Sequence, residues 1–400
     1  MAQQNVTLNK TYSTLIQPDL IKRSVRVRDN WFNNGDVAPF SALLRGRGRV
    51  TTETNQTFEW LEKRPNKIMF EVAPASVGAT TLTVNTTADV ASFLSVGSII
   101  KVLKTKEQLV VTAVNGKAIT VTRGYGDDGA GAAAEITADN PAGTHAQVLN
   151  LSRAFPEGSY APEGTVFIST QNKNYSQIFR DTVDITRNDL KSPRYGDNGS
   201  QSGDLRKRRR TEVFKTHQMG IEHQMLFGVP KKDLTGAKPL YVTGGLTHFI
   251  KSNVRSITDP ADFGPGAIDQ IMGLMSAYGA TGDKILMAGN GFLNRLNANA
   301  ISVFGGGAGK SFSDYGVTMK NISTSYGDLK IIFNPVLSAA YPNMGIFVDL
   351  SNVWLHTIQD TTLETNIQIS GYDGVIDTYL TDCGLEVSNE DQHAILTLDW

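Results

Sequence analysis

The stretch from residue 203 to residue 228 constrains the fold more than any other part of the sequence. It contains no proline, Asp204 is placed to cap its first turn, and Gly228 with Pro230 marks its end. Most of its apolar residues share one stripe, as in a helix packed on one side. These residues are Val213, Phe214, Ile221, Met225 and Leu226. The pattern predicts one long helix over residues 203–228.

The start of this predicted helix is almost purely cationic and carries the run Arg206-Lys207-Arg208-Arg209-Arg210. Positive charge at a helix N-terminus opposes the macrodipole at a small cost. We therefore expect an external partner, either phosphates or an acidic neighbour, with a solvated helix start as the alternative. Aromatic residues do not alternate with these cations, so base stacking is not indicated. Nucleic-acid contact would use phosphates alone, without sequence preference.

The net charge of the chain hides a division between its two parts. A formal net charge of -1 argues against a wholly basic nucleic-acid binder and against an acidic disordered chain. However, residues 1–232 hold 30 basic and 22 acidic residues, whereas residues 233–400 hold 8 and 17. Opposite net charges of +8 and -9 favour head-to-tail contacts between copies, or one face turned toward a polyanion.

Length and local pattern indicate several packed units. The 400 residues exceed the roughly 250–300 at which one hydrophobic core stops growing. Within residues 71–150, short β-rich runs follow one another, and Asn115-Gly116 between two runs is typical of a tight hairpin turn. We predict a small β-barrel or sandwich inserted there, with strands at 80–84, 98–103, 109–114 and 118–123.

The remaining segments differ in pattern. Residues 1–40 lack periodicity and indicate an extended basic arm, with a disordered tail as the alternative. A loop around Arg45, Arg47 and Arg49 precedes the strand-like run 57–62. Residues 261–400 have an α+β pattern. The elements predicted there are helices over 267–278 and 291–300, a flexible glycine-rich loop over 304–316, and several later strands.

Two glycine motifs were weighed as nucleotide sites. Residues Gly124 to Gly129 match G-x-G-x-x-G, but two aspartates occupy the loop and the preceding strand belongs to a hairpin. Residues Gly305 to Ser311 end like a phosphate-binding loop, but Phe304 stands where its first glycine is required. Both are therefore interpreted as surface loops, and no cofactor is expected.

Other chemistry has little support in the sequence. His217, Glu222 and His223 share the long helix but lack the spacing of a zinc motif, so no metal site is expected. The single cysteine, Cys383, excludes a disulfide framework and is expected to be a small buried residue. We find no signal peptide and no apolar run long enough for a membrane span, so we expect the protein to be cytosolic where it is made.

An ordered set of short motifs resembles a known family. The set runs from the arm through Val37 to Leu44, Phe58-Glu59-Trp60, Thr120 to Gly126, Phe155 to Gly158, Phe227-Gly228, Gly244-Gly245-Leu246 and Gly384 to Glu390. It resembles the major capsid proteins of tailed double-stranded DNA phages with the Hong Kong 97-type fold. The likeness is to the branch that has a domain inserted in the extended loop.

This resemblance implies an α+β chain in named parts. The implied parts are an N-terminal arm (1–40), an extended β-hairpin loop (41–70 and 151–195), the β-barrel-like insertion (71–150), a peripheral domain (196–260 and 345–400, with the helix 203–228 as its spine) and an axial domain (261–344).

The resemblance also implies a structural, non-enzymatic function. Copies would form hexamers and pentamers of an icosahedral shell around double-stranded DNA, with portal and possibly scaffold or decoration proteins as partners. The alternatives are another virion protein, of tail or decoration type, the shell of a cellular nanocompartment, and distantly a nucleotide-binding enzyme. The expected contacts with neighbours or DNA are Arg23, Arg26, Arg28, Arg45, Arg47, Arg49, Arg206, Lys207, Arg208, Arg209 and Arg210.

Overall fold

The structure, a computed structural model, divides into two compact units. Unit 1 comprises Met1–Trp60 and Asn172–Trp400, and unit 2 comprises Leu61–Gln171. The described residues are 38–63, 69–86, 90, 93–126, 132–138, 144–155, 157–160, 169–192, 203–277, 279, 284–304, 311–314, 317–324 and 326–399. Most of the predicted arm, including Arg23, Arg26 and Arg28, lies outside them.

Unit 2 is built around a closed six-stranded barrel. Its strands are β3 (Met69–Val72), β4 (Thr81–Asn85), β5 (Ser98–Val102), β6 (Gln108–Asn115), β7 (Ala118–Thr122) and β8 (Ala146–Arg153), in the order β3-β4-β7-β6-β5-β8. Alternate residues point inward, so Leu82, Ile100 and Leu109 are fully buried. Gly116 has a positive φ of 57°, as the tight turn between β6 and β7 requires.

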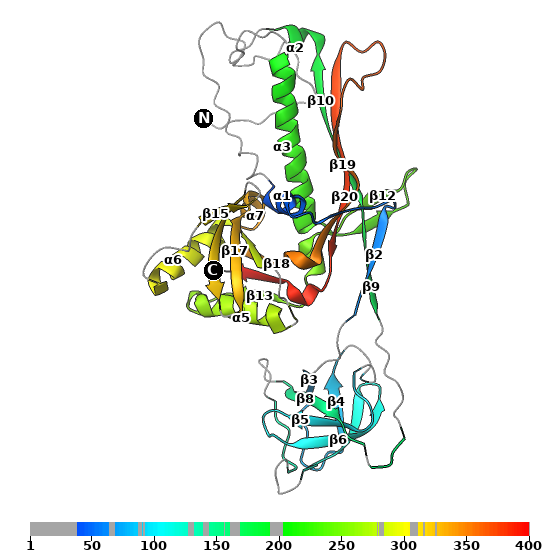
Figure 1. Cartoon of the computed structure of the whole chain (residues 1–400), viewed down its shortest axis with the longest axis vertical. Coiled ribbons are helices and arrows are strands. Elements are labelled where there is room, and N and C mark those ends of the chain that lie inside the picture. The colour runs from blue at the N-terminus through cyan, green and yellow to red at the C-terminus, as the bar shows by residue number, and fades with distance from the viewer. Residues whose placement is uncertain are drawn as a thin grey trace. The chain divides into compact units, whose positions relative to one another are not determined.

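Unit 1 contains a seven-stranded mixed sheet (Figure 1). A hydrophobic cluster packs on each of its faces. On β14, Leu286 and Ala288 face the cluster of helices α5 and α6, whereas Ile285 and Met287 face α1 and the end of α3. The strands, in spatial order, are β13 (Val254–Ile257), β21 (Ala394–Leu398), β18 (Met344–Asp349), β14 (Lys284–Ala288), β17 (Gly327–Phe333), β16 (Val317–Thr324) and β15 (Ser311–Asp314).

The helices around this sheet are mostly short. They are α1 (Pro39–Gly46), α4 (Leu246–Phe249), α5 (Pro265–Ala277), α6 (Asn290–Phe304) and α7 (Pro335–Ala340), with 3-10 turns η3 (Pro260–Asp262), η4 (Leu350–Asn352) and η5 (Glu390–Gln392). Two-stranded sheets pair β2 (Thr57–Glu62) with β9 (Thr170–Tyr175), and β11 (Lys231–Asp233) with β12 (Leu240–Val242).

The long helix α3 (Gly203–Phe227) runs beside a second sheet in unit 1 (Figure 1). That sheet has the order β1 (Val50–Thr52), β19 (Val353–Glu364), β20 (Gly374–Val387), β10 (Gln177–Thr186), and β10 leads into α2 (Arg187–Lys191). Near the start of α3, Leu205 packs on Val183 and Ile185 of β10. Farther along, the helix contributes to the core beneath the seven-stranded sheet.

Three local expectations were wrong. Helix α1 occupies Pro39–Gly46, where the end of an extended arm and a loop were expected. Helix α3 already begins at Gly203, which places Asp204 inside its first turn instead of at the cap. The second half of the expected flexible loop contains strand β15, because it pairs with β16 in the sheet. For α1 the reason is a partner from a distant segment, Glu222, which accepts hydrogen bonds from the amides of Phe40 and Ser41 and overrides local propensity.

Candidate assembly surface

Asp377 of β20 binds the beginning of α3 through two arginines. Arg206 donates to both carboxylate oxygens, with Nε–Oδ2 at 2.8 Å and Nη2–Oδ1 at 2.5 Å, and Arg210 Nε lies 2.9 Å from Oδ2. The backbone amide of Asn366, in the turn between β19 and β20, donates to Oδ1 at 3.1 Å. This group therefore fastens the helix to the long β19–β20 hairpin.

The charge state of Asp377 follows from these contacts. Burial by itself would raise the pKa of the carboxyl, because desolvation disfavours the charged form. The hydrogen bonds from Arg206, Arg210 and the Asn366 amide outweigh that effect and hold the pKa of Asp377 well below its usual range. The hydrogen bond to Asp377 raises the pKa of Arg206 further. Asp377 and Arg206 are thus both charged near neutral pH.

The other cations of the run have different surroundings. Arg208 and Arg209 each lie 3.1 Å from a carboxylate oxygen of Glu212, one turn along the same helix. Lys207 is exposed, and its backbone carbonyl accepts a hydrogen bond from Thr211. Arg208 and Arg209 thus pair with an acid of their own helix, whereas Arg206 and Arg210 pair with Asp377 of β20.

The predicted arginines of the 45–49 segment lie beside β19. Arg45 forms an ion pair with Asp360, and this contact holds the pKa of Asp360 below its usual value against the opposing effect of burial. The Arg49 guanidinium stands 4.7 Å from the ring centroid of Trp354. Arg47 is half-buried.

Glu222 of α3 has a structural role, although the sequence analysis tested it only as a possible metal ligand. Its fully buried carboxylate accepts from the amides of Phe40 (2.9 Å) and Ser41 (3.0 Å) and from Asn334 Nδ2 (2.9 Å). It therefore caps α1, whose own Ala38 supplies no capping side chain. Burial raises the pKa of Glu222 despite these hydrogen bonds. One signal in the sequence could have revealed this buried role: Glu222 is an acidic residue directly beside Ile221, in the apolar stripe of the helix.

His217 and His223, which were considered with Glu222 as metal ligands, have other hydrogen-bond partners. His217 Nδ1 is 2.6 Å from Asp181 and Nε2 is 2.7 Å from Thr381, whereas His223 bonds the carbonyl of Met219. Among the described residues, no group of three His, Cys, Asp or Glu side chains is arranged to hold a metal ion. In the same part of the chain, no helix is long and apolar enough to cross a membrane.

His356 of β19 lies between two glutamates at the base of the second sheet. Its Nδ1 is 2.9 Å from Glu53 and its Nε2 is 2.5 Å from Glu386, while its ring stacks on Phe58 at 4.3 Å. Burial would lower the pKa of this imidazole, but the two carboxylates outweigh it and raise the pKa above its ordinary value. The protonated form thus links the segment before β2 to β19 and β20.

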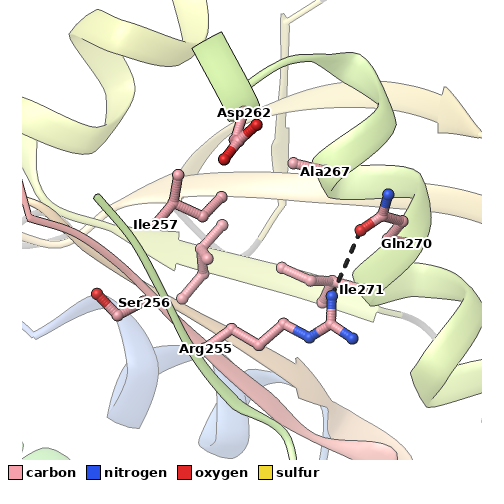
Figure 2. A pocket seen from close by; sticks show the side chains of 8 residues that line it. Arg255, Ser256, Ile257, Asp262, Ala267, Gln270 and Ile271 are labelled. Carbon is pink, nitrogen blue, oxygen red and sulfur yellow. Dashed lines mark hydrogen bonds between the residues drawn. The ribbon is translucent and has the colours of Figure 1, made fainter. Parts of the chain in front are cut away.

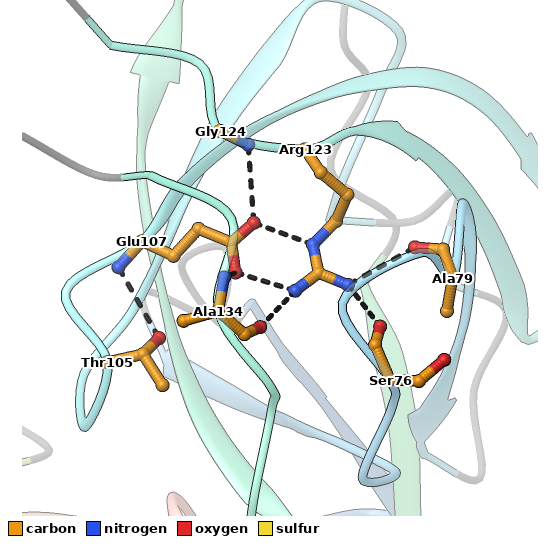
Figure 3. Close-up of polar contacts among 7 residues, drawn as sticks. All are labelled: Ser76, Ala79, Thr105, Glu107, Arg123, Gly124 and Ala134. Atoms are coloured by element: carbon orange, nitrogen blue, oxygen red, sulfur yellow. Dashed lines mark hydrogen bonds and ion pairs between the residues drawn. The ribbon is translucent and has the colours of Figure 1, made fainter. Parts of the chain in front are cut away.

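In unit 2, the carboxylate of Glu107 accepts a hydrogen bond from the amide of Gly124, the first glycine of the G-x-G-x-x-G motif (Figure 3). Its carboxylate accepts from Arg123 at 2.6 and 2.7 Å and from the amides of Gly124 and Ala134, both at 3.2 Å. Arg123 also donates to the carbonyl of Ser76 at 2.8 Å. A buried carboxylate thus already accepts the Gly124 amide, while Asp127, Asp128 and Gly129 of the motif lie outside the described residues. Residues 305–310 of the other glycine motif lie outside the described residues.

A pocket of about 380 Å³ opens between β13 and α5 (Figure 2). Arg255 from the strand and Gln270 from the helix meet across it, with Arg255 Nη1 at 3.4 Å from Gln270 Oε1. Asp262 and the apolar Ile271 also line it. The pocket has one cation and one carboxylate and no group poised for catalysis.

Comparisons with known proteins place the chain among capsid proteins. The family model described as SU10 major capsid protein matches residues 33–398. No curated protein matches the chain. Among solved structures, the chain is similar to the capsid of a native gene transfer agent (GTA) particle, with 12% identity, 96% of this chain and 95% of that chain covered, and a TM-score of 0.45.

Two further structures show similar values. The capsid of an empty GTA particle gives 9% identity, with 93% of this chain and 98% of that chain covered and a TM-score of 0.47. Mycobacterium phage Bobi gives 13% identity, with 62% and 81% covered and a TM-score of 0.42.

Proposed function

The chain belongs to the SU10 major capsid protein family, and we propose that its copies assemble as hexamers and pentamers around double-stranded DNA. It is a structural virion protein that builds the shell of a phage-like particle. The observation that carries the proposal is the match over residues 33–398, which includes both units and nearly all described elements.

We further propose the parts of a Hong Kong 97-type subunit for this chain. The arm is assigned to residues 1–40, and the extended loop to 41–70 and 151–195 with the barrel inserted between them. The peripheral domain takes 196–260 and 345–400, and the axial domain takes 261–344. The continuous helix α3 beside β10, β19 and β20 supports the spine assignment, and the closed barrel within unit 2 supports the insertion.

Among the proposed contact residues, we distinguish cations that bind within the chain from cations that would bind a partner. Arg206 and Arg210 are engaged with Asp377, so their proposed contribution is to hold the spine in place. Lys207 is exposed, and Arg208 and Arg209 pair with Glu212 on the same helix, so these three are the proposed contacts with phosphates or an acidic neighbour. The arm arginines, with Arg45, Arg47 and Arg49, complete the proposed set, and portal, scaffold or decoration proteins are its further proposed partners.

Electron microscopy of the purified chain tests the assembly proposal. We expect rings, sheets or closed shells, with sixfold and fivefold capsomers resolved in two-dimensional class averages. Small particles only, across a range of salt, pH and protein concentration, would contradict it.

Salt-dependent binding of free subunits to duplex DNA tests the phosphate contacts. The Lys207→Ala variant should bind all duplex sequences more weakly and reduce the slope of log affinity against log salt by about 0.9, the value for one lost phosphate contact. The matched Arg255→Ala variant removes an exposed cation from β13 and should leave the slope unchanged. Equal slopes for Lys207→Ala and the unsubstituted chain would exclude this residue as a phosphate contact.

A further inference from the structure

The β11–β12 hairpin, residues 229–242 in unit 1, has little internal support. It follows α3 and is held by three residue pairs, Lys231 with Val242, Lys232 with Tyr241 and Asp233 with Leu240. Isolated two-stranded hairpins are marginally stable in water and need a further packing surface. Figure 1 shows this hairpin standing out from the rest of unit 1.

The base of the hairpin, by contrast, is firmly built. Gly245 donates to the carbonyl of Gly228 at 2.9 Å, and Gln224 Nε2 donates to that of Thr243 at 2.7 Å. The buried side chain of Asn174 binds the backbone of Gly244 twice. Its Oδ1 accepts from the Gly244 amide at 2.8 Å, and its Nδ2 donates to the Gly244 carbonyl at 3.1 Å. A Cβ atom at Gly245 would lie 2.6 Å from the carbonyl oxygen of Met225, so the chain crosses here at backbone contact. The hairpin therefore leaves α3 in a fixed direction.

Beyond this base the hairpin exposes large apolar side chains. Val229 is 64% exposed, Leu234 63% and Leu240 60%. Single exposed apolar residues are normal on protein surfaces, but three within twelve residues on one projecting element mark an interaction site. A rigid base reduces the ordering cost when such a surface binds a partner.

The charges around these side chains indicate what the partner is. The hairpin carries Lys231, Lys232 and Lys238 against one acid, Asp233. Residues 243–400 hold 7 basic and 16 acidic residues, so their net charge is opposite in sign to that of the hairpin. A basic, apolar projection and an acidic body on one chain favour a heterologous contact between copies.

We propose that the β11–β12 hairpin docks on the acidic part of a second copy of this chain, with Leu234 and Leu240 as apolar anchors and the lysines around them. This rests on the proposed self-assembly and specifies one of its contacts. In the single chain Tyr241 of the hairpin packs on Tyr175 of β9, with ring centroids 5.8 Å apart. In the assembled shell the exposed Leu234 and Leu240 would gain a packing surface as well.

Thiol labelling of the chain expressed alone tests the contact directly. The native Cys383 is fully buried and burial raises the pKa of its thiol to about 12, so it leaves a low background. In a Leu234→Cys variant, the introduced thiol should react with a maleimide at least tenfold more slowly in purified shells than in free subunits. Equal rates in shells and subunits would overturn the docking proposal while the shell function stood. Absence of shells from the unsubstituted chain would instead contradict the proposed function.

Substitutions then test whether the contact matters for assembly. The Leu234→Ser/Leu240→Ser variant should lower the yield of shells at least tenfold, with an unchanged circular dichroism spectrum and unfolding midpoint, because both side chains are exposed in the single chain. A Leu234→Met variant keeps an apolar side chain and should assemble as the unsubstituted chain does. Normal shell yield from the double serine variant would refute the anchoring contribution.

Discussion

Glu107 in unit 2 and Asp377 in unit 1 are both buried carboxylates bound by arginine, but their arginines differ in exposure. Arg123, the partner of Glu107, is 7% exposed, whereas Arg206 and Arg210, the partners of Asp377, are each 25% exposed. The first pair is thus removed from water on both sides, and the second keeps its cations at the surface. Glu222 is a third case, buried without a cation, and burial raises its pKa. The environment of the partner therefore decides what each carboxylate contributes.

The largest difference between these sites should appear when an arginine is removed from the barrel. Arg123→Met leaves the Glu107 charge buried without its cation, which costs about 3–5 kcal/mol of stability. Hydrogen exchange of the full chain should show faster exchange in amides of residues 69–153 and unchanged exchange in α3. The double variant Glu107→Met/Arg123→Met removes both charges and should recover part of the loss. Unchanged barrel exchange in Arg123→Met would contradict the comparison.

A smaller loss is expected when Asp377 is neutralised. Asp377→Asn frees two arginines that can be hydrated where they stand, so we expect about 1.5–3 kcal/mol of destabilisation, the range for hydrogen bonds to charged groups. Urea unfolding at pH 7 measures it, and the variant Glu364→Gln, at an exposed acid of β19, should stay within about 0.5 kcal/mol of the unsubstituted chain as the control.

The same variant has a predicted dependence on pH. The pKa of Asp377 is depressed in the folded chain, so its stabilisation is present above the unfolded value of about 3.9 and is lost as pH falls through the folded value. The difference in stability between Asp377→Asn and the unsubstituted chain should therefore shrink below about pH 4. A difference that stays constant down to the lowest pH at which the chain is folded would contradict this assignment.

The smallest expected effect is at His356, where the sign is reversed. Its folded pKa is raised, so its stabilisation is fully present below the unfolded value of about 6.5 and is lost as pH rises through the folded value. A His356→Gln variant should lose this contribution, on the order of 1 kcal/mol, at pH 6 and differ less from the unsubstituted chain at pH 9. Unfolding midpoints at the two pH values measure it, and a larger difference at pH 9 would contradict it.

Local sequence signals predicted an element well where its own periodicity and turn residues specify it. The predicted barrel strands overlap β4 to β7, Gly116 forms the expected turn, and the helix predicted over 203–228 is α3. Helix α1 was missed because its capping group, Glu222, lies 182 positions away from Phe40. In the same way, Arg206 and Arg210 were predicted from their charge, but Asp377, which binds them, has no local mark in the sequence.

The sequence alone determined the long helix, the β-rich stretch and the division of charge, because periodicity, turn residues and composition are properties of neighbouring residues. The resemblance to capsid proteins came separately, from the order and spacing of short motifs along the chain. Tertiary structure decided which charges are engaged within the chain and which remain for partners. Arg206 and Lys207 are adjacent in one cationic run, yet one binds a buried carboxylate and the other faces water. That distinction depends on which distant strand the helix packs against, and only folding brings the two together.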